Sequence, residues 1–156
     1  MLAEYVNPFI IGALEVFEQV ANIELKKSGV TLRGNTAPSN EIAIIMDVSG
    51  YLTGQVVYSF KEHTAQRVVS AMMPKSSPEQ QAEYLYDALS SMANMITGHA
   101  TILLAGKEHI ILITPPIVRL NVKNPAEFHQ RKTLSVVFNS RFGTMECNIS
   151  LILSKA

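Results

Sequence analysis

A regular alternation near the end of this 156-residue chain constrains its fold more than any other feature. One side of residues 145–153 carries Met145, Cys147, Ile149, Leu151 and Leu153, and the other side carries Glu146, Asn148, Ser150 and Ile152. Successive side chains of a strand point to opposite faces of a sheet, so this period predicts a strand with one face in the core. The thiol of Cys147 falls on that core face, where a buried and inert cysteine is expected.

Other segments repeat the same period and predict further strands of one sheet. The first group has Ile42, Ile44, Met46 and Val48 on one face, and the second has Leu134, Val136 and Phe138. The segment Gly54 to Phe60 is a return strand, and His109 to Thr114 is an apolar strand that ends at Pro115-Pro116. A short strand is expected around Val30 to Arg33, within an otherwise loop-like stretch from Lys27 to Asn40.

Helix signals separate these strands. Asn7-Pro8 predicts the start of a helix that runs to about Lys26. Two S-x-x-E/Q capping boxes follow, one at Ser59 to Glu62 and one at Ser77 to Gln80, and the second opens a long helix that ends at Gly106. This order predicts a single α+β domain over residues 1–156, with a mostly antiparallel sheet and amphipathic helices packed on one face.

The charge and composition of the chain exclude several classes of function. Thirteen basic residues offset thirteen acidic ones, and Lys and Arg form no run, so no nucleic-acid partner is expected. The apolar stretches are too short to span a membrane, and the first residues do not resemble a signal peptide. With a single cysteine and four scattered histidines, the sequence predicts a cytoplasmic protein without a metal site.

The long helix is expected to carry the function, because its two sides differ sharply in chemistry. On a helical wheel, one side gathers Leu85, Leu89, Met92, Ile96, His99 and Leu103. The opposite stripe contains no Lys or Arg and consists mainly of short side chains: Glu83, Asp87, Ser90, Ser91, Asn94, Thr97, Gly98 and Thr101. A surface of this kind lets the backbone of another protein come close, although an exposed face that is simply poor in charge would have the same sequence.

The segment Leu89 to Gly98 resembles the signature helix of the CheX/CheC/FliY phosphatases of bacterial chemotaxis. In that family a Glu stands three residues before an Asn, and Asn94-Met95-Ile96-Thr97-Gly98 matches the sequence from the Asn onward. Tyr5 to Ile10 and the strand Gly54 to Phe60 also look like CheX. The resemblance implies that Asn94 is a catalytic residue, which orients a water molecule to attack the aspartyl-phosphate of a CheY-like receiver.

The family's Glu, which pairs with a lysine of the receiver, is replaced by Ser91. The carboxylate of Asp87, one turn upstream, is an alternative partner for that lysine. The resemblance further implies that the receiver binds over a set of six residues and supplies Mg²⁺ itself, so that this chain needs no cofactor; the six are Asp87, Ser90, Ser91, Thr97, Gly98 and Thr101. It also implies a homodimer. A receiver-binding or scaffold module without catalysis stays the alternative function.

Overall fold

The computed structural model describes residues 3–155, and its strands form one antiparallel sheet. The strands follow the order β1-β6-β7-β3-β2-β4, and β5 also pairs with β2. Their bounds are β1 Lys26–Arg33, β2 Ile42–Gly50, β3 Leu52–Phe60, β4 Ile111–Ile113, β5 Ile117–Leu120, β6 Thr133–Ser140 and β7 Gly143–Leu153. The predicted fold class, a mostly antiparallel sheet with helices, is confirmed.

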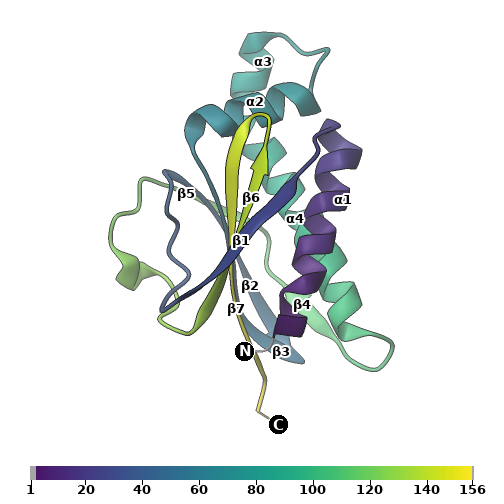
Figure 1. The fold of residues 1–156 in the computed structure, drawn as a ribbon, viewed down its shortest axis with the longest axis vertical. Coiled ribbons are helices and arrows are strands. Elements are labelled where there is room, and N and C mark those ends of the chain that lie inside the picture. Colours follow the sequence, from purple (N-terminus) through teal and green to yellow (C-terminus); the bar gives the residue numbers. More distant parts are fainter. Residues whose placement is uncertain (1–2, 156) are drawn as a thin grey trace.

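Two long helices cover one face of this sheet. Figure 1 shows α1 (Asn7–Ala21) and α4 (Leu85–Ala105) side by side along the strands, while α2 (Glu62–Met72) and α3 (Pro78–Glu83) lie at one end. Short 3₁₀ turns occur at Ala3–Tyr5 and Pro125–Glu127. Because both long helices lie on the same face, the outward side of α4 is free to meet another molecule.

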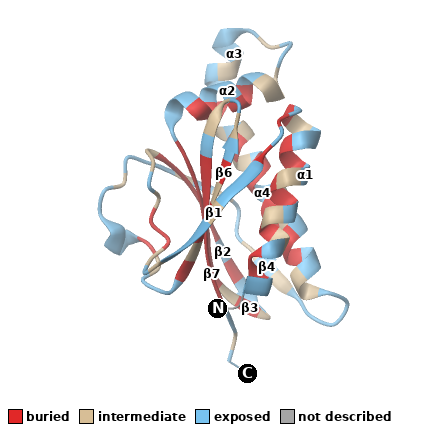
Figure 2. Cartoon of the chain, viewed as in Figure 1, coloured by how far each residue is buried: buried red, intermediate tan, exposed pale blue. Residues whose placement is uncertain are grey.

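The main core lies between this helix pair and the sheet, as the alternation predicts. Strands β2, β3, β6 and β7 direct their apolar side chains toward the helices, and the interior of the sheet is buried along most of its length (Figure 2). Ile44, Val56 and Ile149 are completely buried there. Burial of Cys147 raises the pKa of its thiol well above the usual range, so this cysteine stays protonated inside the core.

Three predicted boundaries are wrong for local reasons. Helix α1 ends at Ala21 rather than near Lys26, because Asn22 adopts the left-handed conformation (φ 52°) and its N–H donates back to the carbonyl of Glu18. Ser59 caps no helix: it is a buried residue of β3, and its hydroxyl accepts from the Asn40 N–H. The predicted long helix is two helices, interrupted at Tyr84.

Other predicted boundaries are confirmed. Both hydrogen bonds of the capping box at Ser77 are present. The Gln80 N–H donates to the Ser77 hydroxyl at 3.2 Å, and the Ser77 N–H donates to the side-chain oxygen of Gln80 at 3.0 Å. Gly106 ends α4 with a positive φ of 61°. The strand expected around Val30 to Arg33 is longer than predicted and occupies one edge of the sheet. Strand β5 was not predicted; together with β4 it pairs along β2 at the other edge.

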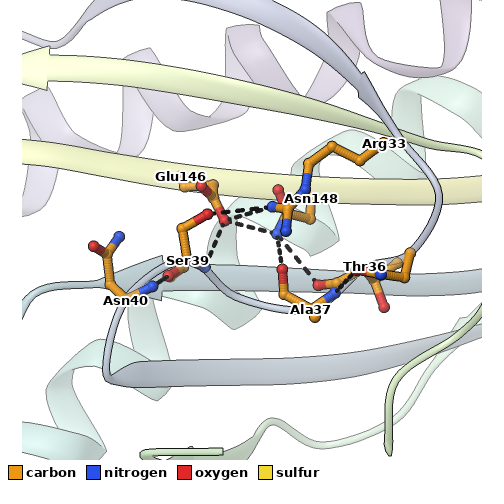
Figure 3. Close-up of polar contacts among 9 residues, drawn as sticks. Arg33, Thr36, Ala37, Ser39, Asn40, Glu146 and Asn148 are labelled. Carbon is orange, nitrogen blue, oxygen red and sulfur yellow. Dashed lines mark hydrogen bonds and ion pairs between the residues drawn. The ribbon is translucent and has the colours of Figure 1, made fainter. Parts of the chain in front are cut away.

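The second face of the sheet carries buried polar residues under loops. The side-chain amide of Asn148 donates to the carbonyls of Thr36 and Ala37 and to the carboxylate of Glu146 (Figure 3). That carboxylate also accepts from Arg33 at 3.2 Å. The loops between β1 and β2 and between β5 and β6 therefore close this face through hydrogen bonds and a small apolar cluster: Ala37, Ala43, Val57 and Phe128.

Candidate functional site

Helix α4 holds the candidate site on its outward side, because its apolar side is packed against the sheet. Leu85, Leu89, Met92 and Ile96 are buried as predicted. Asp87, Ser91 and Asn94 are exposed, also as predicted, while Ser90 and Gly98 are half-buried. The helix thus presents Asp87, Ser91 and Asn94 on three successive turns, one above the other.

The predicted exposed stripe is wrong at Thr97 and Thr101, which are buried. The hydroxyl of Thr97 forms a 2.8 Å hydrogen bond with the Tyr58 hydroxyl in β3, and the hydroxyl of Thr101 donates to the carbonyl of Gly98. Both polar groups are satisfied, so burying them costs little. These two threonines cannot line a docking surface, and Leu103, expected on the apolar side, is exposed instead.

The second half of α4 also packs closely against α1. A Cβ atom at Gly12 of α1 would lie 3.1 Å from the carbonyl oxygen of Ile96 and 3.5 Å from the Cβ of His99. Glycine at this position lets the two backbones approach at the second half of α4. The approach packs the turn that contains Ile96 and His99 against α1, whereas Thr97 lies toward β3, where it meets Tyr58.

A shallow groove of about 470 Å³ runs along the exposed side of α4. Asp87, Ser90, Ser91 and Asn94 form one wall, and the connection between β4 and β5, residues 113–116, forms the other. Sequence reasoning identified the helical wall but missed this second one. The signal in the sequence was Pro115-Pro116, which marks the end of a strand but does not reveal that the turn will face α4.

Hydrogen bonds to β2 hold the second wall in place. The backbone N–H of Thr114 donates to the carbonyl of Asp47 at 3.0 Å, and the Thr114 hydroxyl accepts from the Asp47 N–H at 2.9 Å. Neither Pro115 nor Pro116 has an N–H to donate, so the edge of the sheet is interrupted here. The groove therefore has an outer wall that is hydrogen-bonded to β2 and lined by uncharged side chains.

The chemistry of the groove is that of a site open to a polar partner. Asp87 is the one ionisable residue among those that line it. Within residues 3–155, the side chains of Asp87, Ser91 and Asn94 form no hydrogen bond or ion pair with the rest of the protein. A free carboxylate can bind an incoming cation, and a free amide can both donate to and accept from a water molecule.

Gly98 adds a separate observation on the same side of the helix. A Cβ atom at this position would meet nothing within 4 Å, and the residue has no positive φ. Glycine in a helix interior costs about 0.5–1 kcal/mol relative to alanine. Nothing within the described chain requires a glycine here, so an alanine would fit this turn of α4.

Residues 3–155 contain neither a metal-binding cluster nor a membrane-spanning helix. No group of three or more His, Cys, Asp or Glu side chains in this range is arranged to hold a metal ion. No helix in the same range is both long and apolar enough to cross a membrane.

Comparison with solved structures defines the class of protein first. The fold matches a CheC-like superfamily protein from Shewanella sp. PV-4 with a TM-score of 0.82 and 24% identity, over 97% of this chain and 99% of that one. It also matches a CheX from Borrelia burgdorferi, solved in a CheX-CheY-BeF3-Mg²⁺ complex, with a TM-score of 0.79 and 21% identity over 94% and 97% of the two chains. The fold is thus CheC-like.

Sequence comparison then identifies the family. Residues 42–139 match the sequence profile of the family described as "Chemotaxis phosphatase CheX". The chain is also 30% identical over 118 residues to the CheY-P phosphatase CheX of Thermotoga maritima, which covers 76% of each protein. The chain belongs to the CheX family, and the resemblance inferred from its long helix is confirmed.

Proposed function

We propose that this protein dephosphorylates the aspartyl-phosphate of a CheY-type receiver. The observation that carries the proposal is the side chain of Asn94, which is exposed at a groove and has no internal hydrogen-bond partner among the described residues. Its family relative from Thermotoga maritima is named a CheY-P phosphatase, and the Borrelia burgdorferi relative was solved with CheY. Both support the same substrate class for this chain.

The proposed role of Asn94 is to orient the attacking water. Its amide oxygen accepts one hydrogen of the water, which aims the oxygen lone pair at the phosphorus. The water oxygen forms the new bond to phosphorus, while the bond from phosphorus to the aspartate oxygen of the receiver breaks. Inorganic phosphate leaves and the receiver regains its carboxylate. Such transfer depends mainly on alignment and charge, so one positioned amide can contribute much of the acceleration.

The receiver supplies the remaining groups in this proposal. Its Mg²⁺ neutralises charge on the phosphoryl oxygens, and its lysine needs a carboxylate from the partner protein. Ser91 is too short and uncharged to meet that lysine, and a missing charge-assisted hydrogen bond costs about 1.5–3 kcal/mol. Asp87 lies four residues upstream on the same exposed side, and its side chain has no partner among the described residues, so it is the alternative carboxylate for that lysine.

A non-catalytic role is the second candidate, and Ser91 is the observation that favours it. A CheX-family protein without the carboxylate can retain the surface that docks a receiver while the reaction stays slow. The protein would then compete for the phosphorylated receiver, or hold it within a larger complex. Both candidates use the same groove, so they differ in rate and not in where the receiver binds.

The deciding experiment measures both properties on one panel of CheY-type receivers. Each receiver is phosphorylated with a small phosphodonor, and its decay is followed with and without this protein. In parallel, binding is measured to the same receivers charged with beryllofluoride and Mg²⁺, a stable mimic of the phosphorylated form. Accelerated decay supports the phosphatase. Binding without acceleration supports the module, and neither with any receiver contradicts both.

The homodimer implied by the family resemblance stays a prediction. The sheet edge formed by β4 and β5 is consistent with it, because Leu112, Ile117 and Leu120 are exposed there. An edge strand with exposed apolar side chains readily pairs with another chain. Sedimentation equilibrium of the wild type and of Ile117→Lys tests the idea: we expect a dimer that the lysine weakens. A monomeric wild type would contradict it.

A further inference from the structure

One side-chain hydrogen bond ties the helix of the candidate site to the sheet. The hydroxyl groups of Thr97 in α4 and Tyr58 in β3 lie 2.8 Å apart, and both side chains are almost completely buried. Within residues 3–155 it is the sole side-chain hydrogen bond between α4 and any strand. The buried side of α4 that packs in the main core is otherwise mainly apolar, with Leu85, Leu89, Met92, Ala93, Ile96 and Ala100.

This pair of hydroxyls sits in surroundings that favour keeping them uncharged and paired. Tyr58 is fully buried, and burial raises the pKa of its phenol well above the usual range. On the neighbouring strand β7 it pairs in register with Cys147, another buried and protonated group. A buried hydroxyl pair adds little net stability, since water bonds are lost in forming it. What distinguishes it from an apolar contact is its dependence on the angle between donor and acceptor.

Direction matters because of where Thr97 stands relative to Asn94. The two residues are three apart on one helix, which places their side chains about 60° apart around its axis. The packed apolar side chains already limit rotation of α4, and the hydrogen bond to the buried Tyr58 adds a constraint that depends on angle as well as distance. A rotation of about 10° moves an atom about 6 Å from the axis by about 1 Å. A misplacement of that size can reduce a catalytic rate by about 100-fold.

We propose that Thr97, held by Tyr58, is a positioning residue that fixes the rotation of α4 and thereby aims the Asn94 amide into the groove. The proposal rests on the proposed phosphatase function of Asn94. It also assigns a purpose to a polar pair that an apolar pair could replace in a core. Thr97 acts through Asn94 and does not itself contact the receiver, because it is completely buried.

The test compares three substitutions that change the hydrogen bond but little else. Thr97→Val keeps the branched shape and removes the hydroxyl, Thr97→Ser keeps the hydroxyl, and Tyr58→Phe removes its partner. For a phosphorylated receiver that the wild type dephosphorylates, we expect Thr97→Val and Tyr58→Phe to lower kcat about ten- to 100-fold with KM nearly unchanged. Thr97→Ser should stay within about three-fold of the wild type, and the double variant Tyr58→Phe/Thr97→Val should be no worse than either single one.

A second readout does not depend on activity. Residual dipolar couplings of the backbone N–H groups of α4 report its rotation relative to the sheet. They should change in Thr97→Val and Tyr58→Phe and stay the same in Thr97→Ser. Unchanged couplings together with wild-type kcat in Thr97→Val would overturn the positioning role, as would a loss of activity that only follows a lower Tm. If Asn94→Ala is as active as the wild type, the proposed function fails instead, and the couplings alone decide whether the bond orients α4.

Discussion

Polar side chains occupy two contrasting regions of this molecule. On the outward side of α4, Asp87, Ser91 and Asn94 are exposed and make no side-chain hydrogen bond within the described chain. On the loop-covered face of the sheet, Asn148 is completely buried and Glu146 nearly so, and both are extensively bonded. The first group has its hydrogen-bonding capacity free for a partner, while the second has used most of its own to close the fold.

Because of this difference, two residues of the same type are expected to serve different purposes, one in function and one in stability. Asn94 and Asn148 are both asparagines, yet removing the first takes a hydrogen-bond partner from no group within residues 3–155. Removing the second leaves three acceptors, the carbonyls of Thr36 and Ala37 and the carboxylate of Glu146, without this donor. Substitutions on α4 should therefore change activity, and substitutions on the loop-covered face should change the free energy of unfolding.

The largest effect is expected at Asn94. Asn94→Ala should lower receiver dephosphorylation by about 100-fold, because the water loses the amide that aligns it. Its free energy of unfolding should change by less than about 0.5 kcal/mol, since the side chain is exposed. A phospho-receiver decay time course and urea unfolding measure the two properties. Gln19→Ala, which removes an exposed amide on α1 outside the groove, is the control; equal activity of both variants would place the chemistry elsewhere.

The reverse pattern is expected at Asn148. Asn148→Ala should lower the free energy of unfolding by about 2–3 kcal/mol, because it leaves buried acceptors unsatisfied. Dephosphorylation by the folded fraction should stay close to the wild-type rate. Urea unfolding checks the first expectation, with Asn139→Ala, an exposed asparagine of β6, as the matched control. A loss below about 0.5 kcal/mol would mean that the hydrogen bonds of this face contribute little.

The sequence alone predicts much of the fold because the relevant signals are local. The alternation of Met145, Cys147 and Ile149 determines which side of β7 faces the helices, and the capping box at Ser77 fixes where α3 begins. The covering of the other face cannot be predicted this way. It depends on loops that fold back over the sheet, and the partners of Asn148 are more than 100 residues away in the chain for two of its three bonds.

The same limit applies to the candidate site. Asn94 and Thr97 both fall on the polar side of an ideal helical wheel, and no local signal separates them. Only Thr97 is buried, because its hydroxyl forms a hydrogen bond with the hydroxyl of Tyr58, 39 residues earlier in the chain. The wall formed by Pro115 and Pro116 was missed for a related reason, because its position opposite α4 depends on the pairing of β4 and β5 with β2.

A smaller effect is expected when the missing carboxylate is restored. Ser91→Glu should raise the dephosphorylation rate about ten-fold if the receiver's lysine still meets this position, since one charge-assisted hydrogen bond is gained. The cost in stability should be a few tenths of a kcal/mol, from repulsion with Asp87 four residues away. The measurement is a decay time course with Ser91→Glu and Asp87→Ala in parallel, and Ser70→Glu on α2 is the control.

The outcomes of this pair distinguish three states of the site. A gain from Ser91→Glu without a loss from Asp87→Ala indicates a weakened phosphatase. A loss from Asp87→Ala without a gain from Ser91→Glu indicates that Asp87 has taken over the lysine contact. If neither substitution changes the rate while the beryllofluoride-charged receiver still binds, the non-catalytic module is the function that remains.

The smallest change in function is expected at Gly98, where stability and receiver binding should change in opposite directions. Gly98→Ala should raise the free energy of unfolding by about 0.5–1 kcal/mol, because alanine is the better helix former and its Cβ meets nothing within 4 Å. The same methyl group should weaken binding of a beryllofluoride-charged receiver, if the partner's backbone approaches the helix here.

The matched control is Gly12→Ala, whose Cβ would lie 3.1 Å from the Ile96 carbonyl oxygen and should destabilise the protein. Urea unfolding and receiver titration are measured on both variants. Gly98→Ala with higher stability and unchanged receiver affinity would remove this turn of α4 from the docking surface, and would restrict that surface to the turns from Asp87 to Asn94.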